Sequence, residues 1–202
     1  MKLKNILIGA AVGTIGMVLV GLKWYDIFPS KKINFQPYKG HSFIYKNYQS
    51  HMKNIGDNFN DIFKSMEAAG HSKDSFLFIG VYFDNPELLD DKSKFRYAIG
   101  IKVDDTKAQQ IFPSLENQGF LIKKLPDSVS LNTHYKYRSY CSFLLAPIFW
   151  KRIGKKYKSL KLPIDKKLAA IETYDIKNNG KIELDLISGE NSNEYQFSSF
   201  AE

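Results

Sequence analysis

The order in which strand-like and helix-like patterns follow one another is the feature that most restricts the fold of this chain. An extended segment is followed by a helix with one apolar face and then by two further extended segments, and a similar order returns later. Such an order favours an α+β sandwich, in which helices cover one side of an antiparallel sheet. The repeat is inferred from element order alone, because the two halves show no sequence similarity to each other.

The first half predicts one helix among three strands. Phe43–Tyr45 forms a brief strand, and apolar residues over Met52–Met66 then recur at the spacing of one helix face, ending near Gly70. Phe76–Phe83 is apolar on both sides, so it is expected to be a central strand or to close a pocket. Phe95–Val103 alternates between apolar and other residues, which is the pattern of a half-buried strand.

The second half predicts two helices and four strands. The helices are expected at Thr106–Gly119, where Pro113 makes the pattern irregular, and at Ser142–Leu160. The strands are expected at Phe120–Leu125, Val129–Tyr137, Ala169–Lys177 and Lys181–Ile187. The last two are joined by Asn178, Asn179 and Gly180, residue types that tolerate positive φ and therefore favour a hairpin turn.

The N-terminal segment indicates a membrane anchor. Asn5–Leu22 carries no charge over about 18 residues, near the lower limit for a helix that spans a bilayer. Trp24 and Tyr25 follow it, and aromatic rings suit the headgroup boundary. The end of the uncharged segment fits the small-x-small cleavage pattern poorly, so an uncleaved anchor is favoured over a signal peptide.

The anchor sets the expected domain boundaries and compartment. We expect a membrane anchor over residues 1–25, a tether over 26–40, one globular domain over 41–189 and a short flexible tail over 190–202. Lysines are more numerous after the uncharged segment than before it, no N-x-S/T glycosylation site occurs, and Cys141 is the only cysteine. These signals together favour a domain that faces the cytosol.

Motifs for catalysis and for metal binding are scarce. The four histidines have neither HExxH spacing nor CxxC partners, and the glycine-rich nucleotide loops and the GxSxG elbow are missing. His134 and Cys141 are close in sequence, which alone is a weak indication of a thiol nucleophile. The sequence therefore predicts no enzyme activity, no catalytic residue, no cofactor and no metal.

Glu172 is the first of two features that indicate binding. By strand alternation it shares a face with Tyr174, in an apolar neighbourhood where an unpaired carboxylate is costly. A buried acid beside rings such as Tyr82, Tyr97 or Trp150 would suit a cationic organic ligand as a counter-charge. The simpler and more common alternative is a glutamate at the sheet rim that pairs with a nearby lysine.

A run of basic side chains on the expected last helix is the second feature. The cluster and its continuation hold much of the net charge of +8, and they comprise Lys151, Arg152, Lys155, Lys156, Lys158, Lys161, Lys166 and Lys167. Beside a bilayer such residues can contact anionic lipid headgroups or phosphate, at about 1 kcal/mol for each basic residue near the surface. Nucleic acid is a less favoured partner, and a solvated helix face is the simplest interpretation.

Several segments together resemble the testis-expressed family of endoplasmic-reticulum autophagy receptors. They are IGVYFDNP, RYAIGI, FIYKNYQ, NIGDNF, SYCSFLLAPIFWKRIGKKYKSL and IETYDI. The resemblance covers the N-terminal segment and nearly the entire domain, and YFDNP followed by YAIG is also similar to the wider group of GyrI-like domains. It implies a GyrI-like sandwich of two strand-helix-strand-strand repeats, with a small-molecule pocket to which Tyr82, Tyr97, Trp150 and Glu172 would contribute.

The same resemblance implies a function and partners. Family members are similar in having one anchor, a cytosolic GyrI-like domain and a tail motif for GABARAP-type autophagy modifiers, and related proteins recruit an AAA unfoldase. The tail here lacks that motif, and the internal match of Phe59 and Ile62 belongs to the apolar stripe of a helix.

The sequence therefore predicts a single-pass adaptor or receptor at the endoplasmic-reticulum membrane, acting in reticulophagy. The alternative is a small-molecule-binding GyrI-like module that is tethered to a membrane and has no receptor activity.

Overall fold

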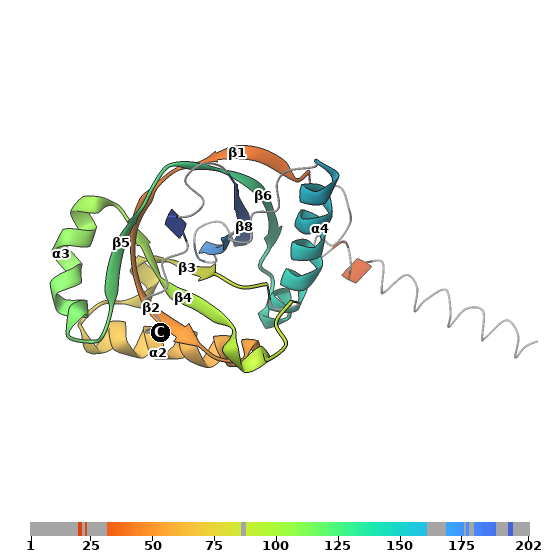
Figure 1. Cartoon of the computed structure of the whole chain (residues 1–202). Helices are drawn as coiled ribbons and strands as arrows, with labels where there is room; N and C mark the ends of the chain where they lie inside the picture. The colour runs from red at the N-terminus through yellow and green to blue at the C-terminus, as the bar shows by residue number, and fades with distance from the viewer. Residues whose placement is uncertain are drawn as a thin grey trace, which may run out of the picture.

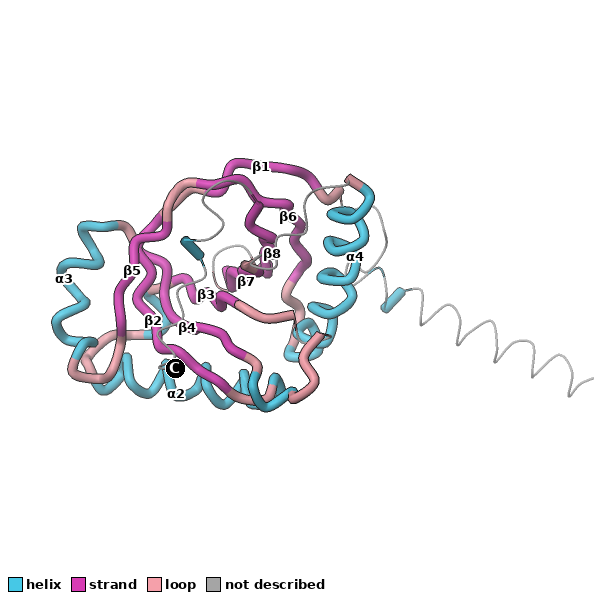
Figure 2. Tube along the Cα trace, in the orientation of Figure 1, coloured by secondary structure: helices cyan, strands magenta, loops and turns pink. Residues whose placement is uncertain are grey.

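A curled antiparallel sheet with helices around its outer face makes up the protein in this computed structural model (Figures 1 and 2), which describes residues 20, 21, 23, 32–85, 88–160, 169–175, 177, 180–188, 194 and 195. The strands are β1 (Asn34–Tyr38), β2 (His41–Gln49), β3 (Leu77–Tyr82), β4 (Arg96–Val103), β5 (Leu121–Leu125), β6 (Ser128–Lys136), β7 (Ala170–Asp175) and β8 (Lys181–Ser188). The helices are α2 (Ile55–Ala68), α3 (Asp105–Glu116) and α4 (Ala146–Ser159), with 3-10 segments η1 (Met52–Asn54), η2 (Lys73–Ser75), η3 (Lys92–Lys94) and η4 (Tyr140–Leu145).

The sheet consists of two similar halves that meet at its centre. One strand-helix-strand-strand unit is β2, α2, β3 and β4, and the other is β6, α4, β7 and β8. In the strand order β1-β6-β8-β7-β3-β4-β2-β5, the arrangement β6-β8-β7 mirrors β3-β4-β2, and β7 pairs with β3 where the units join. The α+β class is therefore confirmed, while α3 and β5 connect the two units and β5 forms one sheet edge.

Strand alternation divides the apolar side chains between the two faces of the sheet. The larger core lies under the helices, where Ile62 of α2 and Phe149 of α4 are buried together with Tyr97 of β4. A smaller core on the opposite face contains Phe43 of β2 and Val81 of β3. Because both faces are covered, β3 is apolar on both sides, as the sequence predicts for a central strand.

The predicted tether and the predicted tail each contain residues that pack against the sheet. The predicted tether contains β1, an edge strand paired with β6, and an edge tolerates Pro37 because it does not need every backbone N–H in the ladder. Within the flexible tail predicted over residues 190–202, Tyr195 is fully buried. Its ring lies 5.9 Å from that of Tyr38, and its hydroxyl donates to the carbonyl of Pro126.

The predicted membrane anchor, residues 1–25, lies outside the described residues except at positions 20, 21 and 23. Lys161, Lys166 and Lys167 and the turn residues Asn178 and Asn179 also lie outside them. In the part of the chain that the structure does describe, no helix combines the length and apolar character needed to cross a bilayer.

Candidate functional site

Glu172 lies on a central strand, and its side chain is on the face that the helices cover. Its strand β7 pairs with β3 on one side and with β8 on the other, and the residue is only 7% exposed. This position does not agree with a glutamate at the sheet rim. Gly80 is its register partner on β3, and a Cβ there would lie 2.9 Å from the Tyr82 hydroxyl oxygen. The glycine therefore leaves room for the Tyr82 ring.

The Glu172 carboxyl accepts hydrogen bonds from three neutral donors. The Tyr82 hydroxyl donates to Oε2 at 3.1 Å, the Trp150 indole Nε1–H donates to Oε1 at 2.6 Å, and the Tyr174 hydroxyl donates to Oε2. The hydroxyl oxygens of Tyr82 and Tyr174 are 3.1 Å apart. No lysine or arginine of the described residues forms an ion pair with Glu172, so its partners are phenols and an indole.

The electrostatics of this cluster favour a positive charge from outside. Burial raises the pKa of the Glu172 carboxyl, although the hydrogen bonds from Tyr174, Trp150 and Tyr82 act in the opposite direction. Burial and the charge of Glu172 raise the pKa values of Tyr82 and Tyr174, so both phenols stay protonated and can donate. An ionised Glu172 would thus have donors but no counter-charge, and a cation beside it would stabilise the charged form.

Aromatic rings surround the carboxyl and its donors. Phe59 of α2 meets the Tyr174 ring edge-on at a centroid distance of 5.1 Å, and Phe143 of η4 lies 5.9 Å from the same ring. The Tyr97 ring is 6.2 Å from that of Tyr82. These rings supply the apolar walls and π faces that an organic cation requires.

Three of the four predicted pocket residues therefore meet directly, namely Tyr82, Trp150 and Glu172. Tyr97 lies one ring away, and its hydroxyl contacts Ser50 and Asn58 instead of Glu172. Sequence reasoning missed Tyr174 as a donor, although strand alternation had placed it on the face of Glu172.

The cluster is closed in this structure. Glu172 is 7% exposed and Tyr82 is 8% exposed, so a ligand does not reach the carboxyl in this arrangement. Trp150 of α4 is the least buried of the three donors. Access to Glu172 therefore requires a rearrangement, and Trp150 is the donor with the least packing to lose.

The other predicted site residues lie elsewhere. Ile62 is fully buried and Phe59 packs against Tyr174, so neither is free to join an extended motif. Lys151, Lys155, Lys156 and Lys158 are exposed on α4. Arg152 is partly buried, with its guanidinium 5.2 Å from the centre of the Phe149 ring.

No metal or thiol site emerges from the described residues. No three histidine, cysteine, aspartate or glutamate side chains gather there in a way that could hold a metal ion. His134 is exposed on β6, and the side chain of Cys141 lies outside what the structure describes.

The curled, doubled sheet is consistent with the GyrI-like fold that the sequence predicts. The structure of SAV2435 bound to tetraphenylphosphonium is similar with a TM-score of 0.51 at 9% identity, covering 82% of this chain and 99% of that one. EcmrR in its complex with DNA is similar with a TM-score of 0.51 at 10% identity, covering 93% of this chain and 68% of that one. At such identities the likeness shows the fold alone.

Sequence comparisons add no family assignment. No protein-family profile matches this chain, and no curated protein matches it. None of these comparisons supports membership of the testis-expressed receptor family.

Proposed function

We propose that this domain binds lipophilic organic cations, with Glu172 as the counter-charge. The observation that carries the proposal is a buried carboxyl with three neutral donors and no cationic partner among the described residues. Burying an ionised carboxylate without a counter-charge costs several kcal/mol. That cost is offset when the positive charge arrives with the ligand.

The surroundings of Glu172 favour a bulky aromatic cation over a compact ammonium ion. Tyr82, Tyr174 and Trp150 place π faces and polarised O–H and N–H groups around the carboxyl. A cation whose charge is spread over aromatic groups is weakly hydrated, so it loses little solvation when it enters such a cluster. SAV2435, which shares the fold, is known in complex with tetraphenylphosphonium, a cation of this kind.

Binding replaces the hydrogen bond between Trp150 and Glu172 with an ion pair between the ligand cation and Glu172. The Trp150 indole donates to Glu172 at 2.6 Å and is the least buried donor, so we expect the cation to displace it. The hydrogen bonds from Tyr82 and Tyr174 can remain, and they hold the carboxylate in place while the ligand binds.

The proposal is tested by titrating tetraphenylphosphonium into the protein in a calorimeter. Glu172→Gln keeps the shape of the side chain but removes its charge, and we expect affinity to fall at least tenfold, or about 1.4 kcal/mol. Glu67→Gln is the matched control, because Glu67 is exposed on α2. The affinity of this variant for tetraphenylphosphonium should match that of the parent protein. Equal affinity in the parent protein and in Glu172→Gln would overturn the proposal.

An uncharged analogue separates charge from shape. Triphenylphosphine oxide has similar aromatic groups and no net charge, so it should bind weakly and be insensitive to Glu172→Gln. If it binds as tightly as the phosphonium, the site is a general apolar pocket and Glu172 is not a counter-charge.

The more specific functions implied by the sequence remain predictions. A receptor in reticulophagy, contact with GABARAP-type modifiers or an AAA unfoldase, and lipid contact through the α4 lysines each await a direct test. The proposed single-pass location at the endoplasmic reticulum predicts that protease added to intact microsomes digests the domain. Protection of the domain would contradict that location. The expected lack of enzyme activity likewise remains a prediction.

A further inference from the structure

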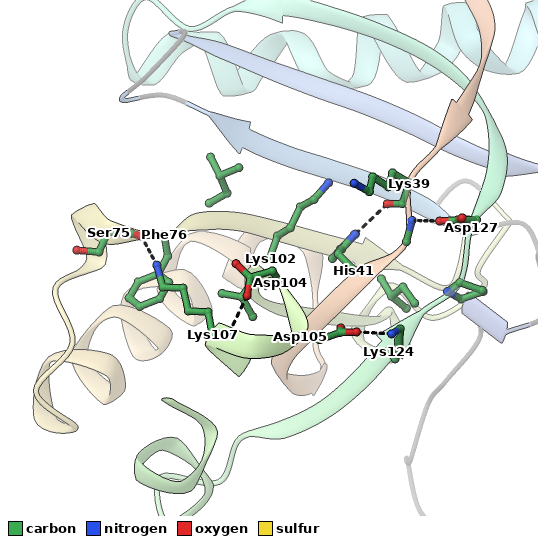
Figure 3. Close-up of a pocket in the computed structure, with 15 residues that line it drawn as sticks. Lys39, His41, Ser75, Phe76, Lys102, Asp104, Asp105, Lys107, Lys124 and Asp127 are labelled. Carbon is green, nitrogen blue, oxygen red and sulfur yellow. Dashed lines mark hydrogen bonds and ion pairs between the residues drawn. The ribbon is translucent and has the colours of Figure 1, made fainter. Parts of the chain in front are cut away.

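A second polar site lies on the opposite face of the sheet from Glu172. A groove runs past the start of β2, the end of β4 and the first turn of α3, and Figure 3 shows the side chains that line it. His41 of β2 and Lys102 of β4 belong to the strand face that carries the smaller core. The site is therefore independent of the cation proposal, both in its residues and in its position.

The acids of the groove are already engaged. Asp105 pairs with Lys124 and also accepts a hydrogen bond from the Ser42 hydroxyl at 2.7 Å. Asp104 caps α3 by accepting from the backbone N–H of Lys107 at 2.7 Å. Asp127 likewise accepts from the backbone N–H of Gly40 at 2.7 Å (Figure 3).

Two of the groove's lysines have partners within the fold, and the other two form no ion pair. Lys124 has its ion pair, while the Lys107 ammonium donates to the Ser75 carbonyl at 3.2 Å and lies 4.3 Å from the centre of the Phe76 ring. Lys39 and Lys102 form no ion pair with any acid of the described residues.

Lys102 is a partly buried cation whose ammonium forms no ion pair with a described carboxylate. Its ammonium lies 5.4 Å from the centre of the Tyr38 ring. Burial lowers the pKa of Lys102, and Lys39 adds to this effect, while the more distant carboxylates of Asp185 and Glu183 oppose it. An anion near this ammonium would therefore meet a charge that the fold leaves without an ion pair.

His41 supplies a third group that lacks a partner. It is 7% exposed, and its Nδ1 lies 3.3 Å from the carbonyl oxygen of Lys39, so Nδ1–H donates there and Nε2 keeps its lone pair. Nε2 is buried and has no hydrogen-bond partner. A buried acceptor without a partner destabilises the fold, and a ligand that donates a hydrogen bond to it would remove this cost.

We propose that Lys39, Lys102 and His41 form a binding site for a phosphate group. The two ammonium groups attract and donate to phosphate oxygens, as lysines do in other phosphate sites. A phosphate that retains one proton also has an O–H, which donates to Nε2 of His41 once the ring turns towards the groove, because this atom is buried in the unliganded structure. A carboxylate has no such donor, so the combination of two cations and one acceptor selects phosphate. Inorganic phosphate and the phosphate of a monoester share this chemistry.

The test is a titration of inorganic phosphate into the full chain at pH 7, followed by calorimetry and by the ring ¹⁵N resonances of His41. We expect Lys39→Gln and Lys102→Gln each to weaken binding at least tenfold. Lys124→Gln is the matched control in the same groove, and its effect should stay below threefold because its ammonium is already paired with Asp105. Lys39 is exposed, so its variant tests the proposal even if Lys102→Gln destabilises the fold.

Sulfate and a monoester refine the result. Sulfate has the shape and charge of phosphate but no proton at pH 7, so it should bind more weakly, and His41→Phe should remove this difference. Tighter binding of glycerol phosphate than of inorganic phosphate would identify a monoester as the ligand, and the reverse order would identify the free ion. The proposal is overturned if phosphate shows no saturable binding, if Lys124→Gln weakens it as much as Lys39→Gln, or if sulfate binds equally well.

Discussion

At the scale of single residues, the Trp150–Glu172 hydrogen bond contributes to the stability of the unliganded domain. Trp150→Phe keeps an aromatic ring but removes the N–H that donates to Glu172 at 2.6 Å. We expect the free energy of unfolding to fall by about 1–3 kcal/mol at pH 7, because a buried carboxyl loses a donor. Urea denaturation measures the loss. In a Glu172→Leu background the same substitution should cost much less, and an equal cost in both backgrounds would contradict the assigned contact.

His41 makes stability depend on pH. Burial lowers the pKa of the His41 imidazole to about 4, and the charge of Lys102 acts in the same direction. In the unfolded chain histidine titrates near 6.5, so between these values the unfolded state binds more protons than the folded state. The contribution is complete above about pH 6.5 and is lost as pH falls towards 4, on the order of 3 kcal/mol.

This pH effect is measured by urea unfolding at pH 7, 5.5 and 4.5. His41→Gln stays neutral throughout, so its stability should fall less over this range than that of the parent protein. Identical pH dependence in the two proteins would show that His41 is not buried in its neutral form.

At the scale of elements, the close approach of β2 and β4 depends on a glycine. A Cβ at Gly100 would lie 1.9 Å from the carbonyl oxygen of Ile44, which is backbone and cannot turn aside. We expect Gly100→Ala to destabilise the domain by about 3 kcal/mol or more, measured by thermal or urea denaturation. Gly154→Ala is the control, since Gly154 lies within α4 with nothing near its Cβ position, and it should stabilise the helix by up to about 1 kcal/mol. Similar effects of the two substitutions would contradict the packing described here.

The individual helices and strands also show how much of the fold could be predicted from the sequence. The apolar periodicity of α2 and the alternation of β4 are local patterns, so these elements were predicted within a few residues. The strand β1 was missed because it depends on pairing with β6, about ninety residues along the chain.

The candidate sites show the same limit. Glu172 was recognisable from alternation within β7, whereas its contact with Tyr82 spans 90 residues and depends on the β3–β7 register. The site of Lys39, Lys102 and His41 was not predicted, because only the β2–β4 pairing brings His41 and Lys102 together.

At the scale of the whole molecule, a residue near the C-terminal end of the chain completes the smaller core. Tyr195 is fully buried there, with its ring against Tyr38. Tyr195→Ala should lower the free energy of unfolding by about 3 kcal/mol, since a large buried ring leaves a cavity. Tyr195→Phe keeps the ring and loses only the hydrogen bond to the Pro126 carbonyl, so it should cost about 1 kcal/mol. Chemical denaturation of both variants measures these free energies. A Tyr195→Ala protein as stable as the parent would show that Tyr195 does not pack against Tyr38.

The whole molecule presents one proposed ligand site on each face of a single sheet. Glu172 lies under the helices, and Lys39, Lys102 and His41 lie around the groove on the other side. The two sites share no residues, so we expect Glu172→Gln to leave phosphate binding unchanged. Calorimetry with phosphate on that variant measures this, and a large loss of phosphate affinity would contradict the independence of the two faces.

The binding of a cation at Glu172 is tested most directly by the indole N–H resonance of Trp150 during a titration with tetraphenylphosphonium. The chain has two tryptophans, so Trp150→Phe assigns the signal. Because the N–H donates to Glu172 at 2.6 Å, displacement by the cation should shift or abolish this resonance in a saturable manner, with the same midpoint as calorimetric binding. A Trp150 resonance that is unchanged when the protein is saturated with the phosphonium would contradict the account.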